Sequence, residues 1–366
     1  MSDFYKQFLV EEPRRLGSGA SRNVFLAAFG KHPGWDDHIE DIGLETESLI
    51  FAKSLLYVQG IGGQIDSGEW EKLDPGHRLD TFKHLLVWQR GGQFLLGRMW
   101  SSSDGKGRKR YPMVVCAHCL GVPLSTALEQ VLPRLEAIER ECLLTSSAGE
   151  VKAVLDQSRE ELRRLFQTVP EATAHPLGAE SLSQLAAKSE LGPDQEGLLR
   201  IVYQMQNQMS AFAPGRVTAK ADPLRLRPQQ IRVPAFAGPV TETIHFWTRF
   251  FQCQLDPATP LLFFLPIEED WLDVTLGEPT LHELFCLRAS PKKFPRASEI
   301  PYNLTPDFKE QARRNIEAFT KNGGEVQAQN GGPAEASTSF LKRLAGLTGW
   351  GGRRDKPGET EHRSRP

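Results

Sequence analysis

Two apolar runs separated by a polar segment form the clearest pattern in the chain. The runs cover residues 94–100 and 111–117, and the segment between them contains two glycines, three serines and four basic side chains. Short apolar runs bounded by such segments are typical of strands joined by a turn or loop. The pattern predicts a strand, an exposed loop and a second strand. A loop carried on two packed strands is a common place for a recognition function.

Shorter apolar patterns precede this loop. Residues 24–29 (VFLAAF) end at Gly30 and are too short for a helix, so they predict a buried strand. Thr46 can cap a helix that runs to about residue 58 and ends at the glycine-rich segment 60–68. Residues 85–88 predict a strand that a Gly-Gly pair joins to residue 94 as a hairpin. The first 120 residues therefore predict a mixed sheet with at least one covering helix.

Beyond residue 121 the apolar spacing becomes helical. Leu124, Leu128, Val131 and Leu135 recur three or four residues apart, and Pro133 predicts a kink in that helix. Further helices are expected over about residues 150–166, 181–187 and 195–209, separated by segments that contain Pro and Gly. We interpret residues 122–230 as a helical insertion.

Sheet-forming patterns return after this insertion. Residues 241–252 predict a helix rich in aromatic side chains, and residues 261–266 (LLFFLP) predict a strand, with one more expected at 284–287. Thr305 and Pro306 predict the start of a polar surface helix that ends at residue 321. Because strands are expected on both sides of the insertion, one sheet is favoured over two independent domains.

The two ends of the chain differ in composition from the part between them. Residues 1–23 are polar and charged, which predicts a disordered leader. Residues 322–366 begin with a stretch of Gly, Ala, Ser and Gln at 322–338, which predicts a flexible tail. Within the tail, residues 339–350 form a short amphipathic segment suited to docking or to peripheral contact with a membrane. The expected folded domain is residues 24–321.

Composition and charge narrow the classes of function. The chain has 44 Lys plus Arg against 46 Asp plus Glu, so it has no overall field that would attract nucleic acid or an anionic membrane. Its five cysteines are odd in number and no export signal is visible, which favours a reducing, cytoplasmic location. No apolar run approaches the roughly 20 residues that span a bilayer, so no transmembrane segment is expected.

Few residue patterns in the chain suggest catalysis. Cys116 and Cys119 form a C-x-x-C, but this spacing on a strand directs the two side chains to opposite faces, which favours buried cysteines over a metal or redox site. No G-x-S-x-G is present, and the glycine-rich segment 60–68 lacks the G-K-S/T ending of a phosphate-binding loop. We therefore predict no catalytic residue and no cofactor.

One loop combines side chains that are able to bind a divalent cation. These are His32, Asp36, Asp37, His38, Glu40 and Asp41. Imidazole and carboxylate are suitable ligands, but a solvated polar loop has the same composition. We assign no metal, and a metal-dependent hydrolase using residues 32–41 remains an alternative.

Two motifs, taken together, carry a resemblance to a known family. FGKHPGWDD at residues 29–37 is followed about 65 residues later by S-x-D-x-x-G-R-x-x-Y-P at residues 102–112. The pair is similar to the signature of the TagF (ImpM) family of bacterial type VI secretion, approximately FGKLPxxGDF and SxDxxGRxFP. The positions carried over as motif or partner-binding residues are Phe29, Gly30, Lys31, Pro33, Asp37, Ser102, Asp104, Gly107, Arg108, Tyr111 and Pro112.

This chain also departs from that signature. His32 stands where the family has an apolar residue, Asp36 where it has glycine, His38 where it has an aromatic residue, and Tyr111 where it has Phe. The resemblance covers residues 24 to about 120 and extends faintly to residues 247–287. The helical insertion and the tail lie outside it.

The resemblance implies a fold and a role. The fold is an α/β domain of longin-like or profilin-like type, with a central antiparallel-rich sheet and helices on both faces. The role is that of a non-enzymatic cytoplasmic regulator that modulates assembly of the type VI secretion apparatus after translation. The implied partners are proteins, such as a forkhead-associated scaffold or another regulatory component, and not nucleic acid.

Elementary chemistry is compatible with this role. Gly30 and Gly107 permit tight turns, and Arg108 is a planar donor that can pair with Asp37 or Asp104 and so tie the two loops together. The loops are therefore expected to be spatial neighbours. A membrane-surface adaptor that uses residues 339–350 is the remaining alternative to the regulator and the hydrolase.

Overall fold

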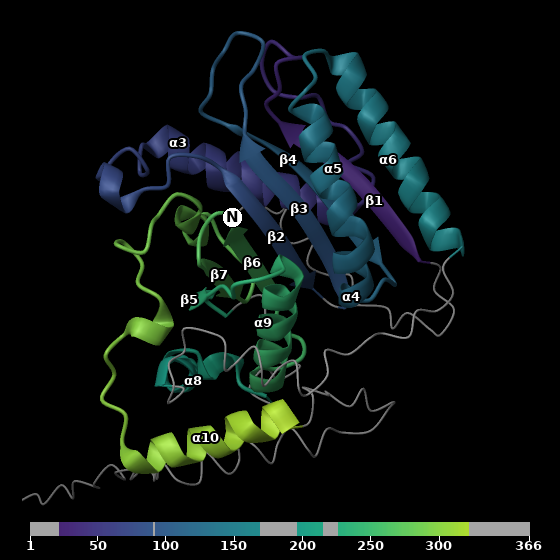
Figure 1. Ribbon diagram of the computed structural model, residues 1–366. Helices are drawn as coiled ribbons and strands as arrows, with labels where there is room; N and C mark the ends of the chain where they lie inside the picture. Colours follow the sequence, from purple (N-terminus) through teal and green to yellow (C-terminus); the bar gives the residue numbers. More distant parts are fainter. Residues whose placement is uncertain (1–21, 91, 169–195, 215–225, 322–366) are drawn as a thin grey trace, which may run out of the picture. The chain divides into compact units, whose positions relative to one another are not determined.

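One seven-stranded sheet organises the computed structural model, which describes residues 22–90, 92–168, 196–214 and 226–321 (Figure 1). The strand order is β1-β4-β3-β2-β6-β7-β5, and every neighbouring pair is antiparallel. The strands are β1 Asn23–Gly30, β2 Lys83–Arg90, β3 Gln93–Ser101, β4 Pro112–Leu120, β5 Gln229–Pro234, β6 Leu261–Pro266 and β7 Trp271–Leu276. Because β2 pairs with β6, the sheet continues across the helical insertion, as predicted.

One face of the sheet is covered by a continuous helical segment. It consists of α2 Glu47–Ala52, the π-helix η1 Lys53–Gly62 and α3 Gly63–Ser67. Thr46 caps it as predicted, because its Oγ1 accepts a hydrogen bond from the Leu49 backbone N–H. The predicted end at residues 60–68 is wrong for most of that segment. Gly60 packs so closely that a Cβ would lie 1.9 Å from Leu284 Cδ1, so glycine serves close packing there.

The opposite face carries most of the remaining helices (Figure 1). They are α4 Leu124–Thr126, the π-helix η3 Ala127–Val131, α5 Leu132–Cys142, α6 Ala148–Thr168, α8 Glu196–Gln208, α9 Val240–Gln254 and α10 Pro306–Lys321. Pro133 lies in the first turn of α5, where its missing N–H is tolerated. Helices on both faces of an antiparallel-rich sheet confirm the predicted α/β class.

Alternation along the strands separates the two cores. On β4, Cys116 packs in the layer beneath α2 and α3, whereas Cys119 packs in the layer beneath α5 and α9. The two thiols therefore point to opposite faces, as predicted. Burial raises the pKa of each thiol to about 12, so both stay protonated at neutral pH.

The strand predictions failed mainly in the part of the sheet formed by β5, β6 and β7. Strands β5 and β7 were not predicted, because Arg232 and Asp273 interrupt their apolar runs although both side chains are buried and paired with each other. Residues 284–287 are not a strand but part of the 3₁₀ helix η6 Glu283–Leu287. The described residues also form the 3₁₀ helices η2 Pro75–His77, η4 Ser210–Phe212 and η7 Ala297–Glu299.

The remaining helix predictions fall into two groups. The helices expected near residues 150–166, 195–209 and 241–252 are present with slightly different bounds. The helix expected at 306–321 is present with the expected bounds as α10, which also buries Ile316 and Phe319 on one face. The leader up to residue 21, the helix expected at 181–187 and the tail with its segment 339–350 lie outside the described residues. Among the residues described, no helix is both long and apolar enough to cross a bilayer.

Candidate functional site

The two motif loops meet where β1 ends beside the start of β4. Gly30 has a φ of 113°, and a Cβ on it would lie 2.2 Å from the Pro112 carbonyl oxygen, so the close approach requires glycine. The Lys31 N–H donates to that oxygen at 3.1 Å, and the Gly105 N–H donates to the Trp35 carbonyl at 2.7 Å. The predicted neighbourhood of the two loops is thus confirmed.

Asp104 forms the buried centre of the site. Its side chain is 0% exposed, and its Oδ2 lies 2.5 Å from Lys31 Nζ and 2.6 Å from Arg108 Nε. Its Oδ1 accepts hydrogen bonds from the backbone N–H groups of Lys106 and Arg108, both at 3.0 Å. The carboxylate therefore closes its own loop and binds the first motif through Lys31.

Arg108 crosses from the second motif to the first. Its Nη2 lies 3.0 Å from Asp37 Oδ1 and donates to the Asp36 carbonyl at 2.9 Å. Lys31 Nζ also lies 3.2 Å from Asp37 Oδ1. The sequence left open whether Arg108 pairs with Asp37 or Asp104, and the structure shows that it pairs with both. We call the four side chains Lys31, Asp37, Asp104 and Arg108 the motif network.

The network keeps both of its carboxylates ionised. Burial by itself would raise the pKa of Asp104, but the hydrogen bonds from Lys31, Arg108 and the backbone outweigh it and hold this pKa well below its usual value. The hydrogen bond from Lys31 is the main reason that the pKa of Asp37 is also lowered. Two cations and two anions thus balance one another, which suits a fixed loop junction.

Aromatic side chains border the network. The His38 ring lies edge-on to Tyr111 with centroids 5.1 Å apart, and its Nδ1 is 2.9 Å from the Tyr57 hydroxyl. Lys31 Nζ lies 5.6 Å from the centroid of the Tyr111 ring. Burial lowers the pKa of His38, which favours its neutral form. Phe29 is buried and packs against Tyr57.

The remaining motif positions have smaller roles. Gly107 has a φ of 76°, in the left-handed region that its turn requires. Pro33 is exposed, and its carbonyl oxygen lies 3.0 Å from the position of a Cβ on Gly105. Ser102 is half-buried, and its side chain makes no hydrogen bond with any residue that the structure describes.

The polar side chains of residues 32–41 do not converge on one point. Asp41 pairs with Lys53, Glu40 pairs with Lys152, and His38 faces Tyr57. His32 points away from the motif network, toward Cys142 and Thr145. Among the described residues, no group of three or more His, Cys, Asp and Glu side chains is arranged to hold a metal ion.

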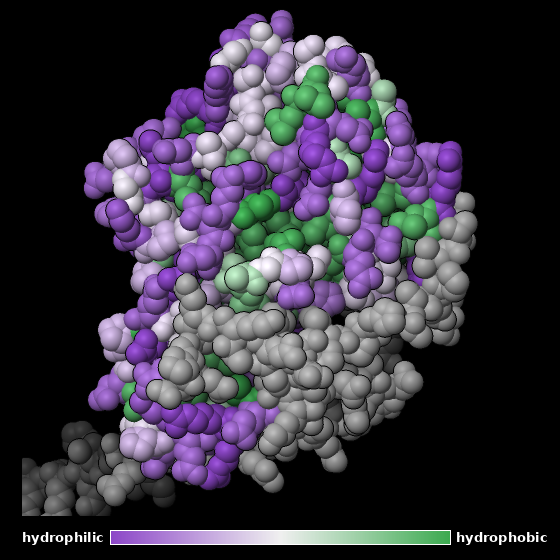
Figure 2. Space-filling model, in the orientation of Figure 1, coloured by the Kyte–Doolittle hydropathy of each residue, from purple (hydrophilic) through white to green (hydrophobic). Residues whose placement is uncertain are grey.

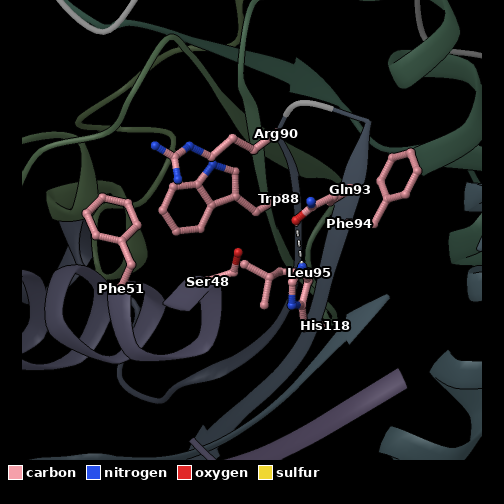
Figure 3. Close-up of a pocket in the computed structure, with 8 residues that line it drawn as sticks. All are labelled: Ser48, Phe51, Trp88, Arg90, Gln93, Phe94, Leu95 and His118. Atoms are coloured by element: carbon pink, nitrogen blue, oxygen red, sulfur yellow. Dashed lines mark hydrogen bonds between the residues drawn. The ribbon is translucent and has the colours of Figure 1, made fainter. Parts of the chain in front are cut away.

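Sequence patterns did not indicate the pocket in Figure 3, because its residues come from four separate elements, α2, β2, β3 and β4. Its empty volume, part of which is open solvent, is about 250 Å³, and it is lined by Ser48, Phe51, Trp88, Arg90, Gln93, Phe94, Leu95 and His118. His118 lies 3.0 Å from Thr46 Oγ1 and 2.9 Å from Gln93 Oε1, and burial lowers its pKa to about 4. Because these polar groups bind one another, we assign no ligand to the pocket.

No protein-family model matches the chain, and no curated protein sequence matches it. The functional interpretation therefore depends on the motif network and on the resemblance of the two motifs to the TagF signature.

Proposed function

We propose that this protein is a non-enzymatic, cytoplasmic regulator or accessory protein of bacterial type VI secretion that acts through contacts with other proteins. One observation carries the proposal. Lys31, Asp37, Asp104 and Arg108 all occupy positions of the paired TagF-like motifs, and they form one connected network across the two loops. Such a network fixes the relative position of two surface loops, which a recognition surface requires.

The chemistry of the network favours recognition over catalysis. Both carboxylates are held ionised by cations, so neither is poised near neutral pH as a general acid or base. The network contains no Ser, Cys or Thr nucleophile beside a base. Arg108 and Asp37 are more than half exposed, so a partner can reach them from solvent.

The proposed partner is a protein of the secretion regulatory machinery, such as a forkhead-associated scaffold. The rival interpretation as a metal-dependent hydrolase gains no support, because His32, His38, Glu40 and Asp41 are engaged with separate partners. The membrane-surface adaptor depends on residues 339–350, which lie outside the described residues.

Gene deletion and complementation in the native bacterium test this function. Type VI secretion and the number of assembled apparatuses per cell are measured without the gene and after complementation with the wild type, Arg108→Ala or Arg110→Ala. Arg110 is the matched control, because it lies on the same loop but pairs with Glu71 instead of the first motif. We expect the wild type and Arg110→Ala to restore normal secretion and Arg108→Ala to fail. Unchanged secretion and assembly after deletion would reject the proposal.

A further inference from the structure

The turn between α5 and α6 places two consecutive leucines in solvent. Leu143 is 59% exposed and Leu144 is 88% exposed, the highest value among the large hydrophobic side chains that the structure describes. Figure 2 shows a hydrophobic patch at this turn, surrounded by hydrophilic residues. A single exposed leucine is ordinary, but an adjacent pair on one turn offers a partner a continuous apolar contact.

The backbone of this turn is fixed on both sides. Thr145 Oγ1 donates to the Cys142 carbonyl at 2.9 Å. Ser147 and Glu150 form a reciprocal cap at the start of α6: the Glu150 N–H donates to Ser147 Oγ, and the Glu150 carboxylate accepts from the Ser147 N–H at 3.0 Å. The leucines are therefore displayed on an ordered backbone, which reduces the entropy lost when a partner binds.

The first motif loop holds the same turn. His32 is buried, and its Nε2 lies 3.1 Å from the Cys142 carbonyl oxygen and 3.2 Å from Thr145 Oγ1. Its Nδ1 accepts a hydrogen bond from the Gly34 N–H, so the proton of the neutral ring is on Nε2, which donates to the carbonyl. A Cβ on Gly34 would lie 2.4 Å from the Ala148 nitrogen. His32 replaces an apolar residue of the TagF-like signature, so this chain uses a departure from the signature to attach the turn.

Three loops thus share one end of the sheet: the first motif loop, the second motif loop and the α5–α6 turn (Figure 1). The second motif loop contributes positive charge. Lys106 and Lys109 are exposed, and neither ammonium group forms an ion pair with any described residue. By contrast, Arg108 and Arg110 on the same loop are paired.

No nearby carboxylate that the structure describes forms an ion pair with these two lysines. Asp37 and Asp104 are balanced within the motif network. Asp36 on the first motif loop is exposed, and Glu150 keeps its charge at the start of α6, where only neutral serine groups donate to it. Lys106 and Lys109 thus give the second motif loop a cationic tip. The first motif loop links this tip to the apolar turn, because Trp35 binds Gly105 and the neighbouring Gly34 packs against Ala148.

We propose that Leu143, Leu144, Lys106 and Lys109 form a docking surface for a protein segment in which apolar side chains are flanked by carboxylates. This inference rests on the proposed role of the motif loops in partner binding. The leucines supply apolar contact, and the lysines attract the acidic flanks and reject basic segments. A second copy of the chain is an outcome that the test distinguishes.

Binding of defined peptides tests the surface on the full chain. The probes are three fluorescent peptides: one with two central leucines and acidic flanks, one with the leucines replaced by serine, and one with basic flanks. We expect the wild type to bind the first peptide most tightly, and Leu143→Ser with Leu144→Ser to bind it roughly tenfold more weakly. Lys106→Gln with Lys109→Gln should weaken binding and remove most of its salt dependence. Val58→Ser, which changes an exposed apolar residue on η1, is the matched control and should bind normally.

A second variant tests the role of the first motif loop. His32→Leu introduces the apolar side chain that the TagF-like signature has at this position and removes the hydrogen bond to the Cys142 carbonyl. We expect faster hydrogen exchange at Thr145 and Ser146 and several-fold weaker peptide binding. If hydrogen exchange and peptide affinity are both unchanged, the first motif loop does not order the α5–α6 turn, and this part of the proposal is wrong.

Several outcomes overturn the docking surface. They are equal binding of acidic and basic peptides, no binding of any peptide, wild-type affinity in the double leucine variant, or concentration-dependent self-association that the double leucine variant abolishes. The last outcome would assign the surface to a second copy of the chain. If Arg108→Ala disrupts secretion while the leucine variants bind normally, the proposed function stands and only the docking surface falls.

Discussion

Two arginine–aspartate pairs show how the halves of the sheet differ. In the second half, Arg232 on β5 and Asp273 on β7 form a two-pronged pair at 2.7 and 2.8 Å, and their side chains are 2% and 3% exposed. Arg232 also donates to the carbonyls of Ala289 and Phe294 and lies over the Trp271 ring. In the first half, Arg108 binds Asp104 and Asp37 but is 51% exposed.

The difference separates a structural role from a recognition role. The Arg232–Asp273 pair is sealed, so no partner can reach it, and its energetic effect is on folding alone. The Arg108 network begins at a sealed carboxylate, Asp104, and ends at an exposed one, Asp37. A buried charge can therefore position exposed side chains, as Asp104 does for Arg108, as well as stabilise a core. The following four predictions test this distinction, beginning with the largest expected effect.

Asp273→Ala should destabilise the protein most, because it leaves the Arg232 guanidinium buried without a counter-charge. Removing one partner of a buried pair costs about 3–5 kcal/mol. The free energy of unfolding, measured with urea, checks this value. Arg232→Met with Asp273→Leu is the control, because removing both charges should cost much less. A loss below about 1 kcal/mol in Asp273→Ala would show that the pair is not sealed.

Gly30→Ala should destabilise the motif end of the sheet. A Cβ there lies 2.2 Å from the Pro112 carbonyl oxygen, and the φ of 113° is strained for alanine, so we expect a loss of about 1–3 kcal/mol. Gly92→Ala is a matched control, since it also has a positive φ but meets no atom within 4 Å. Equal losses in the two variants would attribute the effect to φ alone and remove the argument for close approach.

Acid should weaken the motif network. The pKa values of Asp37 and Asp104 are lower in the folded state than the ordinary carboxylate value of about 4, so the folded state binds fewer protons. Their stabilisation is complete above about pH 4 and is lost as the pH falls through the lowered values. Urea unfolding between about pH 7 and pH 3 should show a steeper loss in the wild type than in Asp104→Asn. Parallel curves would contradict the assigned network.

Arg108→Ala should have the smallest effect on stability, because solvent screens a half-exposed arginine. We expect a loss of at most about 1 kcal/mol, with urea unfolding as the measurement. Arg108→Lys should not restore partner binding, since an ammonium group cannot reproduce the fork that spans two carboxylates. A loss as large as that of Asp273→Ala would place Arg108 among the structural residues instead.

Sequence patterns predicted the elements whose side chains alternate or recur cleanly. Strand β1, the β2–β3 hairpin, β4 and the long helices α6, α9 and α10 followed from apolar spacing and from caps such as Thr46. Strands β5 and β7 were not predicted, because a charged residue on a strand suggests an exposed position. Here both charged side chains are buried, because Arg232 on β5 pairs with Asp273 on β7. Gly60 suggested the end of a helix, whereas its small size serves packing against Leu284.

In the candidate site, too, some features could be predicted from the sequence and others could not. The sequence by itself determined that the two motif loops would be neighbours and that Arg108 would bind a carboxylate, because complementary charges and turn residues are local, pairwise properties. The tertiary structure decided that Asp104 is buried, that Lys31 joins both carboxylates and that His32 leaves the polar cluster to hold the α5–α6 turn. These features depend on which distant segments pack together, and burial is set by all of those neighbours at once.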